Sequence, residues 1–156
     1  MFLSKQYLSG GSMVRKKGSE EKLLNEICQE AKLTGRITDD RIAQLTAVFG
    51  KRFENGWEAF QGNRVKRYLF KPSGREIWIV VGKERDYQVI PSVGFCSCDD
   101  FYFRVVGEGR ETHFCYHLIA QRLAEAMGRY DMIEESDDLY ETLMSEWRNM
   151  GKKRIE

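Results

Sequence analysis

The chain has 156 residues, 42% of them apolar and 12% aromatic, and its 25 basic and 24 acidic residues leave a net charge of +1. This length suits about one domain with a core of its own. The near-neutral charge argues against a uniformly basic coat for nucleic acid. No run reaches the roughly 18 apolar residues of a membrane-spanning helix. We therefore expect an intracellular protein without a membrane partner, cytoplasmic in a prokaryote or archaeon and nuclear in a eukaryote.

Residues 1–18 are expected to form a flexible basic tail. Ser9-Gly10-Gly11-Ser12 is typical of a linker and Met13 follows it, so residues 1–12 are either a cloning remnant or an extension upstream of the natural start. They contain no apolar run long enough for a secretory signal. Arg15-Lys16-Lys17 fits a solvated tail or an arm that contacts phosphates.

Helical periodicity covers residues 19 to about 60. Ser19 has the character of an N-cap, and acidic residues follow it in the first turn, where they suit the helix dipole. Gly35 ends this segment and Thr38 opens the next. Gly50 weakens the second segment, but apolar residues resume at helical spacing as far as Phe60.

The pattern then changes to strands at 65–70, 77–81 and 87–90, separated by turn signals, which predicts a three-stranded antiparallel β-meander. The middle strand is apolar on both faces, with Trp78 and Val80 on one of them. Either both faces are covered within the chain, or Trp78 and Val80 belong to a docking surface for another protein.

Two helices are predicted near the C-terminus. The first runs from His117 to Met127 with Gly128 as its stop, and the second is capped by Ser136 or Asp137. Residues 151–156 are assigned to a basic tail. The fold class expected is α+β: N-terminal helices, the three-stranded antiparallel meander, a metal-binding finger at 95–128 and two C-terminal helices, in one domain over 19–150.

The finger is indicated by Cys96-x-Cys98, a loop of sixteen residues, and Cys115-x-His117. Zinc prefers four thiolate or imidazole ligands in a tetrahedron, and two such pairs supply them. The positive end of a helix dipole at Cys115 also favours its thiolate. The alternatives are that these cysteines belong to a core, or that His113 replaces His117. Cys28 lies on an apolar helical stripe and is assigned to the core.

Four protein ligands leave no open coordination position, so the zinc is expected to be structural and the protein not to be an enzyme. The chain has no His-Glu-x-x-His motif, no His-x-Glu of the zinc deaminase type and no Walker A loop. A catalyst that uses zinc or a cysteine is therefore the least favoured of the functional interpretations.

The order Cys-x-Cys, variable loop, Cys-x-His resembles the SWIM-type zinc finger. The segment from Cys115 to Ala120 resembles the Cys-x-His-x-x-Ala ending of the small SWIM proteins of Shu-type recombination complexes. Similar to those proteins are also the Pro72–Arg75 turn before an apolar strand, and Phe95-Cys96-Ser97-Cys98 followed by Phe101. The likeness covers roughly residues 38–148.

The resemblance implies a non-catalytic adaptor in homologous recombination and DNA repair. Proteins of this type pair with a RecA-family recombinase paralogue and support recombinase filaments on single-stranded DNA. By the same likeness Cys96, Cys98, Cys115 and His117 hold one zinc ion. Ala120 lies one turn beyond the ligands, where a small side chain lets another element approach. That element is either a partner or another part of the chain, and a homodimer is an alternative when the partner is absent.

The second hypothesis is a DNA-binding module that needs no recombinase partner. Arg104, Arg110 and Arg122 lie in or beside the finger, and Lys152-Lys153-Arg154 adds charge at the end of the chain. The aromatic run at 101–103 fits base stacking or, alternatively, packing along a strand. Family members often have proline after the second cysteine. Asp99 stands there instead, and its carboxylate disfavours phosphate contact at that point.

Overall fold

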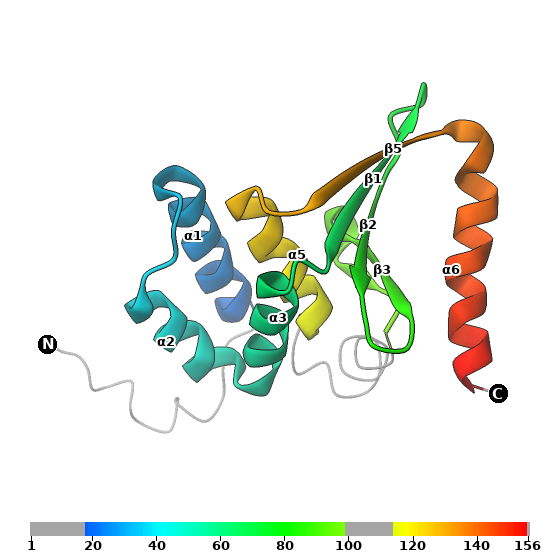
Figure 1. The fold of residues 1–156 in the computed structure, drawn as a ribbon. Coiled ribbons are helices and arrows are strands. Elements are labelled where there is room, and N and C mark those ends of the chain that lie inside the picture. The colour runs from blue at the N-terminus through cyan, green and yellow to red at the C-terminus, as the bar shows by residue number, and fades with distance from the viewer. Residues whose placement is uncertain (1–17, 99–113, 156) are drawn as a thin grey trace, which may run out of the picture.

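The computed structural model describes residues 18–98 and 114–155, with the side chains of 151–155 left out. A central sheet separates one helix, α6, from the other helices, and α5 lies between the sheet and the N-terminal helices (Figure 1). The elements are α1 (Ser19–Thr34), α2 (Asp39–Phe49), α3 (Lys51–Gln61), β1 (Val65–Lys71), β2 (Glu76–Val81), β3 (Asp86–Ile90), η3 (Pro91–Val93), β4 (Phe95–Cys96), α5 (Tyr116–Met127), β5 (Asp131–Ser136), η5 (Asp137–Leu139) and α6 (Tyr140–Ile155).

Local capping explains where the N-terminal helices begin and end. The hydroxyl of Thr38 accepts a hydrogen bond from the backbone N–H of Arg41, so Thr38 is the N-cap that the sequence predicts. For α1 the prediction is one residue late, because Gly18 is the N-cap and Ser19 is already helical. Gly50 ends α2 and begins α3 with a φ of 60°, a backbone conformation that most side chains avoid.

The sheet has five strands in the order β4-β3-β2-β1-β5, so the predicted count of three is wrong. The predicted meander is present as β1, β2 and β3 with antiparallel pairing. The two strands at the sheet edges were missed. Strand β4 has only two residues, and the mostly polar β5 lacks a strand-like apolar alternation but pairs with β1 in parallel.

The sheet divides the buried side chains into two cores. Trp78 and Val80 face the helices and belong to the larger core, which includes residues of α1, α2, α3 and α5. Ile77 and Ile79 face the other way, where they join Phe70 and Trp147 of α6. Both faces of β2 are therefore covered within the chain.

This burial corrects the predicted partner surface. The exposed fractions of Trp78, Val80 and Ala120 are 1%, 0% and 0%, so none of them is presented to a partner. Trp78 and Val80 pack under the helices because the meander needs a helical layer on that face. Ala120 packs inside the same core, which is the intramolecular alternative for its small side chain.

Several predictions concern parts of the chain that the structure does not describe. Arg104, Arg110, His113, the basic run at 15–17 and the aromatic run at 101–103 lie outside the described residues. Helix α6 continues to Ile155, across residues that the sequence analysis assigns to a tail. Within the described ranges, every helix is too short or too polar to cross a membrane.

Candidate metal centre

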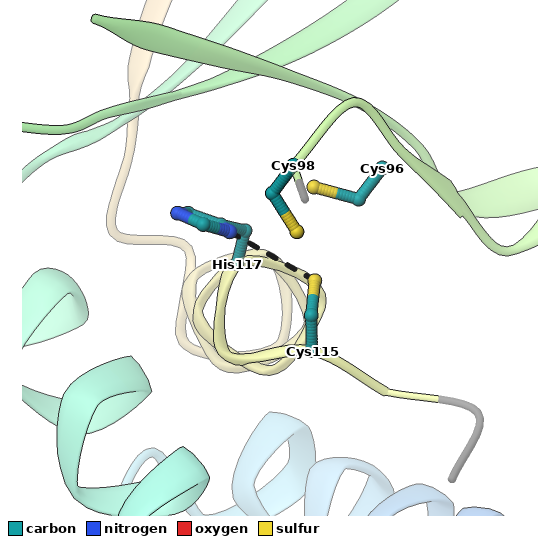
Figure 2. A group of neighbouring side chains, drawn as sticks. All are labelled: Cys96, Cys98, Cys115 and His117. Carbon is teal, nitrogen blue, oxygen red and sulfur yellow. Dashed lines mark hydrogen bonds between the residues drawn. The ribbon is translucent and has the colours of Figure 1, made fainter. Parts of the chain in front are cut away.

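Two chain segments bring the four predicted ligands together. Cys96 ends β4 and Cys98 follows it, while Cys115 is the N-cap of α5 and His117 lies in its first turn. Their ligand atoms all lie within 4.8 Å of one another, and all four residues are buried. The three sulfurs and Nδ1 of His117 converge on one point, with Nδ1 3.8 Å from the Cys115 sulfur (Figure 2).

These dimensions fit a tetrahedral zinc ion. Zinc–sulfur bonds of about 2.3 Å place two sulfurs about 3.8 Å apart, which agrees with a cluster 4.8 Å across. Three thiols and one imidazole are also a typical donor set of structural zinc sites. The cluster can therefore bind one zinc ion through Cys96, Cys98, Cys115 and His117.

Strand β3 holds the Cys-x-Cys half of the cluster. The residue between the two cysteines, Ser97, donates its backbone N–H to the carbonyl of Gln88 at 3.0 Å. Its hydroxyl accepts the backbone N–H of Gln88, also at 3.0 Å. Together with the pairing of Cys96 opposite Val89, these bonds fix the turn to the sheet before any metal binds.

Helix α3 holds the Cys-x-His half. Arg52 donates from Nη1 to the backbone carbonyl of Phe114 at 2.7 Å, directly before Cys115. Gly56 brings the two helices close, because a Cβ at this position would lie 2.9 Å from the carbonyl oxygen of Tyr116. The start of α5, with two ligands on it, is therefore positioned by contacts with α3.

Two tyrosines flank the imidazole of His117. The ring centroid of Tyr87 on β3 lies 4.0 Å from that of His117, and the centroid of Tyr116 lies 3.9 Å from it, with interplanar angles of 31° and 33°. Nε2 of His117 points away from the sulfurs and is buried without a hydrogen-bond partner among the described residues (Figure 2). A zinc-bound histidine usually donates this second N–H to an acceptor that orients the ring. Here the two tyrosine rings take that orienting role.

Tyr87 in turn links the two halves of the cluster. The guanidinium of Arg85 lies 4.6 Å from the centroid of the Tyr87 ring, and its Nη2 donates to the carbonyl of Ser97 at 3.4 Å. Gly82 makes room for the ring, since a Cβ there would lie 2.6 Å from a carbon of Tyr87. The orientation of the imidazole is thus tied to the Cys-x-Cys turn.

The thiols have different proton affinities. Burial raises the pKa of both Cys96 and Cys115, whereas hydrogen bonds from Cys115 and Cys96 lower the pKa of Cys98. Because zinc binds thiolates, its binding must displace the protons of Cys96 and Cys115.

Cys28 and Arg122 lie outside the cluster. Burial raises the pKa of Cys28 to about 11, and its thiol contacts the backbone carbonyl of Arg122 at 3.6 Å between α1 and α5. Arg122 donates to Asn25 on α1 and lies over the ring of Phe114. Its guanidinium, predicted to contact nucleic acid, lies between α5 and α1.

Sequence reasoning missed the residues that support the cluster. Of these, Ser97 carried a signal, because a hydroxyl between two ligand cysteines suits a tight turn. The roles of Arg52, Gly56 and Tyr87 depend on contacts across more than 25 residues of chain, which periodicity and spacing do not reveal.

Several known proteins are similar in sequence to this chain. No protein-family model matches the chain. Over 90 residues it is 35% identical to an uncharacterized protein of Archaeoglobus fulgidus, and the match covers 58% of this chain and 68% of that protein. It is 28% identical over 132 residues to zinc finger SWIM domain-containing protein 7 of Mus musculus, covering 83% of this chain and 86% of the relative. The Dictyostelium discoideum homologue of that protein is 27% identical over 118 residues, 75% of each chain. These matches extend well beyond the finger.

Proposed function

The chain belongs to the SWIM-type zinc-finger proteins, and from this premise we propose that it is a non-catalytic adaptor in homologous recombination. It binds a RecA-family recombinase paralogue and supports recombinase filaments on single-stranded DNA. The observation that supports the proposal is the buried, four-ligand cluster on a chain that is similar over most of its length to zinc finger SWIM domain-containing protein 7 and its homologue.

The ligand set supports a structural role for the metal. With three thiolates and one imidazole around it, zinc has no position left for the water that hydrolytic zinc enzymes activate. Zinc binding contributes to folding instead, on the order of 10 kcal/mol in small zinc modules. Bound by Cys96, Cys98, Cys115 and His117, zinc would join the start of α5 to the edge of the sheet at β4.

The side chains available to a partner differ from those expected. Because Trp78, Val80 and Ala120 are buried, docking must use other residues. Val93 lies on η3, directly before the finger, and 73% of its surface is exposed. Among the exposed apolar side chains of the described residues, Val93 is the docking candidate because it lies beside the finger.

The test is co-purification of RecA-family proteins with the tagged, zinc-loaded chain from its own cells, with mass spectrometry of the eluate. We expect a RecA-family paralogue with the wild type and its loss with Cys98→Ser. Cys28→Ser is the matched control, because it removes a buried thiol outside the cluster. Absence of every RecA-family protein from the wild-type eluate would refute the proposal.

A second pair of variants examines the docking surface. Val93→Asp places a charge beside the finger, and Leu33→Asp places one on α1 at a side chain that is 87% exposed. Loss of the paralogue from Val93→Asp alone would assign docking to the finger side. Equal retention by both variants would exclude Val93 from the interface.

A further inference from the structure

A pocket of about 330 Å³ lies next to the zinc cluster and is separate from it. Its walls come from α3, from the residue before β1, from the turn between β2 and β3, from β3 itself, and from the first residue of α5. The side chains that matter most are Arg64, Lys83, Tyr87 and Tyr116. None of the predicted nucleic-acid contacts is among its lining residues, so this pocket is a new candidate site.

The two cations of the pocket are available to a ligand. Neither Arg64 nor Lys83 forms a side-chain ion pair or hydrogen bond within the described ranges, whereas Arg41, Arg52 and Arg67 all have carboxylate partners. A guanidinium, an ammonium and two phenols therefore surround one space, and all of them can donate hydrogen bonds to an anion.

Two carboxylates at the same pocket narrow the chemistry of the ligand. Glu58 and Glu84 also line it and balance the charge of the two cations. A bare anion gains little from such a site, because attraction and repulsion nearly cancel. A ligand that combines a phosphate with hydrogen-bond donors fits better, since its donors can bind Glu58 and the amide of Asn55 while the phosphate binds the cations.

The tyrosines add an aromatic surface to these polar groups. Nucleobases stack on aromatic side chains in proteins that bind single strands, and the backbone is held by cations alongside. Tyr87 and Tyr116 lie on either side of His117, so the wall that would meet the base is built around a zinc ligand. A shift of His117 would therefore move this wall of the pocket.

We propose that this pocket binds one nucleotide of a single-stranded nucleic acid, with the phosphate at Arg64 and Lys83 and the base beside Tyr116. The proposal rests on the adaptor function, which places the protein on single-stranded DNA. It adds a direct contact between this chain and the DNA. Because Tyr87 and Tyr116 both lie against His117, zinc loading strengthens nucleotide binding, and by linkage the bound strand raises the affinity for zinc.

The experiment is fluorescence anisotropy of a labelled oligothymidine with the zinc-loaded chain alone, at several salt concentrations. We expect salt-dependent binding that weakens several-fold in the double variant Arg64→Gln/Lys83→Gln. The slope of log K against log salt should fall by about 0.7, the value for one phosphate contact to a single strand. Lys22→Gln/Lys71→Gln is the matched control, because it removes the same charge from α1 and from the far end of β1.

Each outcome has one meaning. Equal weakening in both double variants would refute the pocket, because it would show only a general effect of charge. Absence of binding by the wild type at low salt would refute it as well. Stronger binding to oligouridine than to oligothymidine would keep the site and assign it to RNA. If thymidine monophosphate displaces the oligothymidine when the two are at equal concentrations of nucleotide, the pocket binds free mononucleotides. That result would refute the proposal that its ligand is a single strand.

The same variants separate this inference from the adaptor function. Arg64→Gln/Lys83→Gln should retain the RecA-family paralogue in co-purification, since its changes lie in the pocket and not at Val93. A variant that loses oligonucleotide but keeps the paralogue supports both proposals. If oligonucleotide binding survives and no paralogue is recovered, the adaptor function fails while the pocket remains.

Discussion

Replacing Gly56 by alanine tests whether the approach of α3 to α5 sets the position of two zinc ligands. A Cβ at this position would lie 2.9 Å from the Tyr116 carbonyl oxygen and 3.0 Å from Cγ2 of Ile119. An ordinary contact needs at least 3.4 Å, so α5 would have to retreat by about 0.5 Å. The obstacle is backbone, which no change of rotamer can relieve.

Two effects on the stability of Gly56→Ala oppose each other. Alanine favours a helix over glycine by about 1 kcal/mol, and overpacking a close helix contact costs about 1–3 kcal/mol. The net loss in the free energy of unfolding should therefore be about 0–2 kcal/mol. Zinc affinity should change more clearly, because zinc–ligand distances tolerate only about 0.2 Å. We expect a loss of about tenfold, within the range seen when groups supporting metal ligands are altered.

The assay is competition for zinc with a chromophoric chelator, with the absorption spectrum of the cobalt-substituted protein as a second reading of ligand geometry. Glu54→Ala is the control, because it also improves helix propensity on α3 but at an exposed site. Gly56→Ala with wild-type zinc affinity and a free energy of unfolding raised by about 1 kcal/mol would refute the reasoning.

Three further predictions concern protons and rings. Zinc binding should release at least the two protons of Cys96 and Cys115, because burial raises the pKa values of both thiols. The affinity for zinc should therefore fall as the pH falls. Calorimetry in buffers of different ionisation enthalpy counts the released protons, and the release of none would contradict the assignment of these thiols as ligands. Tyr87→Phe should lose zinc to a chelator at the wild-type rate, whereas Tyr87→Leu should lose it several-fold faster. Equal rates of zinc loss from the two variants would show that the ring does not orient His117. Folding raises the pKa of Cys28 from 9.0 to about 11, so the stabilisation from this buried thiol is complete below pH 9.0 and about 2–3 kcal/mol of it is lost as the pH rises to about 11. The urea midpoint of the wild type should therefore fall over this pH range more steeply than that of Cys28→Ala. Parallel curves for the two proteins would contradict the shift.

The sequence was sufficient for the parts of the fold that depend on local signals. Thr38 has the side chain and position of an N-cap, and the meander has alternating apolar residues with turn residues between its strands. The zinc cluster was equally accessible, because ligand type and spacing are sufficient to indicate a tetrahedral site.

The remaining features depend on tertiary contacts. Strand β5 is mostly polar, and it exists because β1 offers a parallel partner at an open edge, which its own pattern does not encode. The burial of Trp78 and Val80 required knowing that the helices cover this face of the sheet. The contact of Gly56 with α5 and the rings around His117 join residues that are distant in sequence, so no local period marks them.

The position of α6 behind the sheet divides the protein into two layers of unequal size. Among the described side chains, four fully buried residues form the core beneath α6, of which the helix contributes Trp147, and other residues of the helix pack there only partly buried. Segments held by few buried contacts open at lower free energy than the rest of a protein. Amide hydrogens of α6 should therefore exchange with solvent before those of α5.

Gln88 is where the two layers meet. Its side-chain amide contacts the sulfur of Met144 on α6 at 3.5 Å, while its backbone holds Ser97 between the two cysteines. Departure of α6 would break the first of these contacts and leave the second, because only the side chain faces the helix. Local unfolding of the C-terminal helix should therefore leave assembled the half of the protein that can bind zinc.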